Sequence, residues 1–321
     1  GVALGLAGTL AIWLADQSIV AVPTNVYAGI AKYPLIAIPM FVLVGSIFDR
    51  SGVALRLVNF AVAIVGRGPG MLPLVAIVVA MFLGGISGSG PANAAAVGAV
   101  MIAAMSRAGY PAAFSASVVG AAAATDILIP PSVAFIVYSV LVPGASVPAL
   151  FAAGMIPGIL AGIALIVPTV WMARKHKMGA HEASLPRPEL WKSFKEATWG
   201  LAAPILILGG MRAGWFTPTE ASVVAVFYAL ICGKYVYRTL EWKAVPDILS
   251  RSALLTASVL LIIGTSASFA WILTIEGMPQ TVANWISGMN LSVWGFLIVI
   301  NIFLLIFGIF IEPQPGVMVL V

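Results

Sequence analysis

The stretch GGISGSGPANAAAVGAV, Gly84–Val100, decides how this chain folds. Four glycines fall in its first seven residues, a proline follows, and an alanine-rich segment follows the proline. Glycine and proline weaken a helix interior, whereas alanine favours one. Because the stretch lies between strongly apolar runs, we expect two helical segments joined by a break at GGISGSGPAN, with the second segment beginning at Pro91.

The composition is that of a helical membrane protein. Of the 321 residues, 61% are apolar and 8% are charged, and the mean hydropathy is +1.09; soluble domains do not have such values. A spanning helix needs about 20 apolar residues, and the chain offers several such runs. We therefore predict an all-α polytopic membrane protein. The predicted apolar runs are 1–14, 34–48, 71–86, 91–105, 112–142, 148–173, 199–211, 218–233, 252–273 and 291–311.

The basic residues indicate which loops face the cytoplasm, because cytoplasmic loops carry an excess of Lys and Arg. If the basic groups are cytoplasmic, the chain leaves the cytoplasm near Arg67 and is back by Arg107. It must then turn within GGISGSGPAN, which predicts a re-entrant hairpin with its tip inside the membrane. A helix at 47–66, lying in the interface plane, is expected to brace this hairpin. The three basic groups are Arg50, Arg56, Arg67 and Arg107; Arg174, Lys175, Lys177, Arg187, Lys192 and Lys195; and Lys234, Arg238, Lys243 and Arg251.

A weak internal repeat predicts a second copy of this arrangement. At an offset of 225 positions, IFDRSGVALRLVNF (47–60) aligns with ILTIEGMPQTVANW (272–285). Each segment is followed by an apolar run and a broken tip, GGISGSGPAN in the first half and GIFIEPQPGV in the second. The charge rule places the two copies in opposite orientations. Inverted-topology repeats of this kind bind substrate and ions near the midplane, where interrupted segments meet.

A second broken segment, AAAATDILIPPSVAF, follows at residues 121–135. Pro130 and Pro131 remove two backbone donors, and non-helical backbone at membrane depth survives only where it is buried or lines a wet cavity. Asp126 stands directly before this break, beside Thr125. An intramembrane acid indicates a functional site, and hard cations prefer oxygen ligands; the alternative is that Asp126 caps the second half-helix.

The hairpin tip offers a second set of candidate ligands. Residues 87–90, SGSG, expose backbone groups and two hydroxyls. The half-helix that begins at Pro91 presents a positive dipole end, which favours an anion, whereas carbonyls of the preceding half-helix favour a cation. Close packing of small residues is the alternative, and it explains Pro91 and Asn93 poorly.

Six motifs follow one another along the chain. They are YPLIAIPMFVLVGSIF from Tyr33, GGISGSGPANAAAVGAVMI from Gly84, ILIPPSVAFIVYS from Ile127, AGMIPGIL from Ala153, GWFTPTEASVVAVFYAL from Gly214 and FGIFIEPQPGVMVLV from Phe307. In these motifs and their order the chain resembles the large membrane subunit of a tripartite ATP-independent periplasmic (TRAP) transporter. The resemblance covers nearly the whole sequence, and both ends look cut, so we expect a fragment of a longer protein.

The resemblance implies a sodium-driven secondary importer of organic acid anions in the bacterial inner membrane, with an elevator-type moving domain and a static scaffold. It also implies two protein partners, a small Q-type membrane subunit and a periplasmic substrate-binding protein. Membrane lipid surrounds such a protein, and no nucleic-acid partner, organic cofactor or metal other than sodium is expected. The chain is not expected to be an enzyme, and no Walker sequence is present.

The family's site residues carry over to the two broken segments. The expected sodium ligands are Ser87, Gly88, Ser89, Asn93, Thr125, Asp126 and Pro130. The expected substrate-binding residues are Ser89, Gly90, Asn93, Pro131 and Ser132. The chain departs from the family at Asp126, since members commonly have an uncharged stretch there, so this acid is expected to alter ion coordination or to bind a proton. The second hairpin is cut after it begins at Glu312.

A self-sufficient sodium and dicarboxylate symporter without a binding protein is the alternative function, and a passive channel or membrane scaffold is a further one.

We expect the chain to be organised in five segments. The segments are 1–83, scaffold and arm helix; 84–147, hairpin and broken helix; 148–198, connecting helix and cytoplasmic loop; 199–306, second scaffold and arm helix; and 307–321, the start of the second hairpin.

Overall fold

The computed structural model describes residues 1–66, 68–88, 90–142, 144–182, 188–289, 291–311 and 313–320. All regular structure in these residues is helical, which confirms the prediction of an all-α polytopic membrane protein. Within them, five helical segments are long and apolar enough to cross a membrane. These are Tyr33–Arg50, Val147–Lys175, Pro218–Val236, Trp242–Ile275 and Val293–Phe310.

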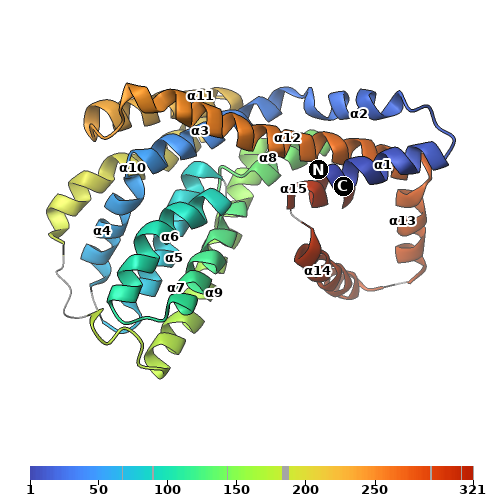
Figure 1. Cartoon of the computed structure of the whole chain (residues 1–321). Helices are drawn as coiled ribbons and strands as arrows, with labels where there is room; N and C mark the ends of the chain where they lie inside the picture. Colours follow the sequence, from blue (N-terminus) through green and yellow to red (C-terminus); the bar gives the residue numbers. More distant parts are fainter. Residues whose placement is uncertain are drawn as a thin grey trace. The chain divides into compact units, whose positions relative to one another are not determined.

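The helices form two compact units. One comprises Gly1–Leu35, Val137–Gly144 and Leu254–Val321, and the other Ile36–Ile136 and Ala145–Ala253. The first unit holds α1 (Val2–Leu14), α2 (Ala21–Ile30), α13 (Met278–Gly288), α14 (Val293–Phe310) and α15 (Pro313–Leu320). The second holds α3 (Ala37–Arg50), α4 (Val53–Val65), α5 (Met71–Ser87), α6 (Gly90–Arg107), α7 (Ala112–Ala123), η2 (Ala124–Ile127), α9 (Val147–Lys175), α10 (Leu190–Arg212) and α11 (Pro218–Ile231) (Figure 1). Helices α8 (Val133–Leu141) and α12 (Val245–Ile275) run from one unit into the other.

The predicted hairpin is formed by α5 and α6. Helix α5 ends at Ser87 and α6 begins at Gly90. Gly88 takes the left-handed conformation, with φ +60°, which costs little only for glycine. Helices α5, α6 and α7 pack on one another (Figure 1). The break in the long run 112–142 is also confirmed, since α7 gives way to η2 and α8 begins only at Val133.

The expectation of one helix over 47–66 is wrong, and the correction exposes the internal repeat. Helix α3 continues to Arg50, and α4 begins after Gly52, whose φ is +69°. In the second half, α12 ends at Ile275 and α13 begins after Gly277, whose φ is +70°. The two glycines lie 225 positions apart, since 277 − 52 = 225. Each half therefore contains a helix, a left-handed glycine and a second helix in the same order, while their opposite orientation in the membrane stays a prediction.

Helix α4 packs on the hairpin, which is the role expected of the helix predicted over 47–66. Its buried residues include Val53, Leu57 and Val58, and it packs against α10 and α5. Gly200 on α10 leaves room for Val53, because a Cβ at this glycine would stand 2.8 Å from Val53 Cγ1. Helix α4 thus packs on α10 at Gly200 and on α5, the first helix of the hairpin.

Helix α2 was not predicted, because Pro23 interrupts its short sequence. The proline lies in the first turn of α2, where a missing N–H costs little because the first amides of a helix have no intrahelical acceptor. The helix packs closely on α12: a Cβ at Gly264 would stand 2.9 Å from Val26 Cγ1, and one at Gly29 would meet Ala267 Cβ at 2.5 Å.

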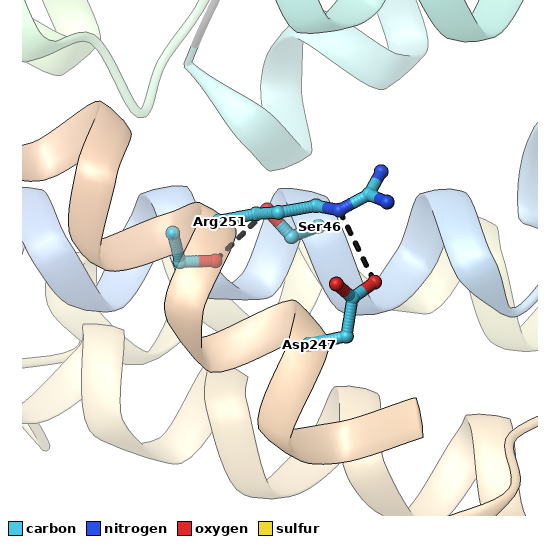
Figure 2. Close-up of polar contacts among 4 residues, drawn as sticks. Ser46, Asp247 and Arg251 are labelled. Atoms are coloured by element: carbon cyan, nitrogen blue, oxygen red, sulfur yellow. Dashed lines mark hydrogen bonds and ion pairs between the residues drawn. The ribbon is translucent and has the colours of Figure 1, made fainter. Parts of the chain in front are cut away.

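The start of α12 is joined to α3 by a hydrogen bond between hydroxyls. Ser252 Oγ donates to Ser46 Oγ at 3.0 Å, and Figure 2 shows Ser46 beside the first turns of α12. On the same turns Arg251 Nε lies 3.1 Å from Asp247 Oδ2 (Figure 2). Both side chains of this ion pair are more than half exposed, so it contributes at most about 1 kcal/mol.

A buried carboxylate ties the loop after α9 to both ends of the hairpin. Glu182 is fully buried and accepts hydrogen bonds from Leu72 N at 2.8 Å and from the Tyr110 hydroxyl at 2.5 Å. Gly70 N donates to the same hydroxyl at 2.7 Å. Leu72 lies in the first turn of α5, where a negative charge also stabilises the helix dipole. His181 N donates to the Ala108 carbonyl just after α6. The loop after α9 therefore contacts both the start of α5 and the end of α6.

Tyr110→Phe tests this tie. Burial, and then the hydrogen bond to Glu182, raise the pKa of the Tyr110 hydroxyl, so the group stays protonated and donates. Its loss leaves a buried amide and a buried carboxylate each without one partner, and we expect the free energy of unfolding to fall by about 2 kcal/mol. Thermal unfolding of the purified protein in detergent measures this. An unchanged melting temperature would contradict the tie, and Tyr138→Phe is the matched control.

Candidate functional site

The candidate site lies where the hairpin tip packs against the break between α7 and α8. The contact is made by backbone and glycine rather than by long side chains. A Cβ on Gly84 would overlap the Asp126 carboxylate, and one on Gly85 would stand 3.3 Å from the Pro130 carbonyl oxygen. The last turn of α5 therefore approaches the broken segment as closely as the backbone allows.

Asp126 and Asn93 form the centre of this site. Asp126 is 0% exposed and Asn93 is 2% exposed. Asn93 Nδ2 lies 2.7 Å from Asp126 Oδ1 and 2.8 Å from Oδ2, and it also donates to the Ala80 carbonyl at 2.7 Å. Because all these partners are acceptors, they fix which end of the amide faces the acid. Asn93 Oδ1 is left buried without a hydrogen-bond partner among the described residues.

Among the described residues, the carboxylate has no positive partner on the elements packed against η2. Helices α5 and α7 contain no charged residue. The charged residue of α6 is Arg107, fourteen residues beyond Asn93 (107 − 93) and so about 21 Å away along the helix. Those of α9 are Arg174 and Lys175, in its last turn. A buried carboxylate is costly unless it is paired, bound to a cation or protonated, so Asp126 requires one of these.

The described residues do not support the capping alternative. Among them the Asp126 carboxylate accepts hydrogen bonds from Asn93 Nδ2 and from no amide of α8. The acid therefore faces the hairpin across the break instead of closing the half-helix that follows it.

The other predicted residues on the broken segment are buried beside Asp126. Thr125 is 3% exposed, and its hydroxyl donates to the Ala122 carbonyl at 2.7 Å. Its own carbonyl accepts from Leu128 N and Ile129 N, so this oxygen is already used by the local turn. Ser132 is 1% exposed, and its hydroxyl has no partner in the described part of the chain.

The hairpin tip supplies the facing residues. A Cβ on Gly88 would collide with the Pro131 carbonyl oxygen, and one on Gly90 would stand 3.2 Å from the Ala123 carbonyl oxygen. The structure thus brings Gly88, Gly90, Asn93, Asp126, Pro130 and Pro131 to one junction. Ser89 and the side chain of Ser87 lie outside the described residues, so their predicted roles as ligands stay predictions.

Sequence reasoning missed the contributions of Gly84 and Ala80. Gly84 makes room for Asp126, and the Ala80 carbonyl orients Asn93. The sequence could have indicated Gly84, since it is the first of the four glycines in the stretch Gly84–Val100. The sequence could not have indicated Ala80, because it acts through its backbone carbonyl, which every residue has.

An apolar groove of about 330 Å³ reaches the same junction from between α5, α9 and α10. Gly85, Ile129 and Pro130 form one wall, and Met155 and Ile159 are on another. None of the described residues that line it is charged. Its chemistry suits hydrocarbon, and an organic acid is not expected to bind in it.

Comparison with known proteins places the chain in a family. Residues 1–321 match the family described as the DctM component of tripartite ATP-independent periplasmic transporters. The chain is 42% identical, over 99% of its length and 74% of the relative's, to the large permease protein DctM of a C4-dicarboxylate TRAP transporter from Pseudomonas aeruginosa. It is 38% identical to the sialic acid TRAP transporter large permease protein SiaM of Vibrio cholerae, over 91% of the chain and 68% of that protein.

A third relative is longer. The chain is 37% identical to the isethionate TRAP transporter permease protein DctMQ of Oleidesulfovibrio alaskensis, over 92% of the chain and 46% of that protein. These relatives are transport permeases of the inner membrane, and permeases are not enzymes. The chain therefore belongs to the DctM family of TRAP transporter large permeases.

Proposed function

We propose that this chain is the transport subunit of a TRAP system that imports organic acid anions together with sodium. The observation that carries the proposal is the buried Asp126 carboxylate, which has an amide as its hydrogen-bond partner and no cation on the packed helices. A transported cation neutralises this charge when it binds. The carboxylate and the cation then cross the membrane as a neutral pair, which lowers the cost of the charge.

The chemistry of the donors favours sodium. The junction offers the Asp126 carboxylate and the Asn93 Oδ1 that has no partner among the described residues. It also offers the backbone carbonyl oxygens of Pro130 and Pro131. Oxygen donors of this kind suit hard cations. We include Ser87, Ser89 and Thr125 in the proposed ligand set.

The substrate is proposed to bind at the start of α6. Its first amides point toward the junction end of the hairpin and favour an anion. The proposed substrate-binding residues are Ser89, Gly90, Asn93, Pro131 and Ser132, and the unpartnered Ser132 hydroxyl supports this set. The relatives are named for C4-dicarboxylates, sialic acid and isethionate. All are organic acids, and we propose this class for the chain, with C4-dicarboxylates or sugar acids as the candidates.

The proposed partners are a small membrane subunit of the Q type and a periplasmic substrate-binding protein. The length of the relative named DctMQ, of which the chain covers 46%, supports a close association of large and small subunits. We further propose an elevator-type movement in which the hairpin and the broken segment move together, because their contact is too close to slide without clashes at Gly84 and Gly88.

Uptake into proteoliposomes tests the proposal. The full-length protein is reconstituted with its small subunit and its binding protein, and the uptake of radiolabelled C4-dicarboxylates and sugar acids is measured with and without an inward sodium gradient. We expect uptake to require both sodium and the binding protein. Uptake without the binding protein would indicate the self-sufficient symporter, and uptake that ignores sodium would remove the coupling from the proposal.

A proton is the second candidate for the coupled cation, because protonation also neutralises Asp126. The same vesicles distinguish the two. Uptake that follows a pH gradient in sodium-free buffer, and that sodium does not stimulate, would assign the coupling to protons.

A further inference from the structure

We propose that the start of α5 and the end of α9 form a binding site for an anionic phospholipid. The headgroup lies at Arg174 and Lys177, and an acyl chain lies in the groove that leads from there along α9. This surface lies at the start of α5, whereas Asp126 lies against Gly84 near the end of that helix, and the inference does not rest on sodium coupling.

Two adjoining hollows provide the space. The first, of about 450 Å³, is lined by Gly68, Pro69, Met71, Arg174 and Lys177, among others. The second, of about 600 Å³, continues along α9. Met71 and Arg174 line both hollows. One ligand with a polar end and an extended apolar end can therefore occupy both.

The first hollow has the charge to hold a phosphate. Arg174, Lys175 and Lys177 are exposed, and the described residues that line both hollows include no acid. Glu182 is the nearest acid along the chain. Its two oxygens are bonded to Leu72 N and the Tyr110 hydroxyl inside the protein. In the described part of the chain, these three cations form no ion pair with an acid.

The positions of these cations are partly fixed. Arg174 Nε donates to the Pro69 carbonyl at 3.4 Å. The terminal nitrogens of the guanidinium have no partner among the described residues and can bind oxygen atoms of a ligand. Lys175 Nζ lies 4.5 Å from the centre of the Trp171 ring. A tryptophan beside a basic residue at the end of a spanning helix is typical of the membrane interface. The hollow therefore lies at headgroup depth.

The second hollow distinguishes a lipid from a soluble anion. Leu74, Ile166, Val167 and Val170 line it, and α9 is one of the helices long and apolar enough to span the membrane. A free phosphate would bind the cations and leave the apolar residues of the second hollow uncovered. A phospholipid uses both parts, and basic pockets between helices on the cytoplasmic side bind anionic headgroups.

The site touches the base of the hairpin. Met71 and Leu74 belong to the first turn of α5, and a Cβ on Gly70 would stand 3.1 Å from Val170 Cγ1. A bound lipid packs against the α5 leg and against α9 at once. We therefore expect it to stabilise the contact between these two helices.

A lipid titration of the full-length protein in neutral detergent tests the site. Native mass spectrometry measures the apparent dissociation constant for dioleoylphosphatidylglycerol. Dioleoylphosphatidylcholine and inorganic phosphate are the comparison ligands. We expect the double variant Arg174→Gln/Lys177→Gln to bind phosphatidylglycerol about 10- to 30-fold more weakly. The matched control is Lys192→Gln/Lys195→Gln, which removes equal charge from exposed positions near the start of α10; it is expected to bind as the wild type does.

A second variant tests the acyl groove without changing charge. Val167 is 65% exposed, so Val167→Trp fills the groove with no change to the core, and we expect it to weaken binding several-fold. Ile205→Trp, at a position that is 72% exposed on α10, is its control. Equal binding of phosphatidylcholine, equal losses in variant and control, or full occupancy by inorganic phosphate that displaces the lipid would each overturn the proposal.

Discussion

Asp126→Ala lowers sodium-driven uptake by about 100-fold or more. Breaking a buried ion pair by removing one partner costs about 3 kcal/mol or more, and each 1.4 kcal/mol is a factor of ten in affinity. The carboxylate is 0% exposed, so water does not replace it. Uptake by proteoliposomes, measured over a range of sodium concentrations, gives both the rate and the half-saturating sodium concentration.

Two further variants separate charge from folding. Asp126→Asn keeps the size of the side chain and removes its charge, and we expect it to fold and to lose sodium-dependent uptake. Asp247→Asn changes an exposed acid on α12 and is expected to transport normally. Full uptake by Asp126→Asn with an unchanged sodium requirement would show that the carboxylate does not bind the coupled cation.

The two breaks in the helices could be predicted from sequence because both are local. The glycines at 84–90 and the prolines at 130 and 131 disrupt helices through their own backbone chemistry. Helix α5 ends and α6 begins among these glycines, and the two prolines lie between η2 and the start of α8. The same reasoning failed at 47–66, where Gly52 takes a left-handed φ and separates two helices. An isolated glycine inside a helical pattern is often tolerated, so its effect depends on the packing around it.

The partners within the site could not be predicted in the same way. Asn93 and Asp126 are 33 positions apart, and their hydrogen bond depends on how α5, α6 and η2 pack. Sequence reasoning identified both residues as candidates, from membrane depth for one and from the hairpin motif for the other. It did not identify their contact or the unpartnered Asn93 Oδ1, because both are consequences of tertiary packing.

The tie at Glu182 was missed for a similar reason. The residue follows a basic loop and would ordinarily be solvated, yet it is fully buried. Its partners Leu72 and Tyr110 are 110 and 72 positions away. Sequence patterns report spacing along one helix or strand, and contacts across such distances leave no periodic signal.

Gly88→Ala is expected to lower the free energy of unfolding by about 2–4 kcal/mol. Two costs add at this position. A non-glycine residue at φ +60° costs about 1 kcal/mol or more in the left-handed conformation that Gly88 takes. The new Cβ also collides with the Pro131 carbonyl oxygen, and overpacking costs about 1–3 kcal/mol. Because the obstacle is backbone, no side chain can rotate to relieve the collision.

The effect reaches the transport site as well as stability. Relief of the clash requires the hairpin tip to move away from the broken segment, and this movement separates Asn93 from Asp126. Thermal unfolding in detergent and uptake in proteoliposomes measure the two consequences. The control is Gly120→Ala in α7, where an added Cβ meets nothing within 4 Å and the helix gains about 0.5–1 kcal/mol. If Gly88→Ala unfolds at the same temperature as the wild type, the tip does not pack on Pro131 as closely as the structure places it, and the assignment of Gly88 to the site loses its support.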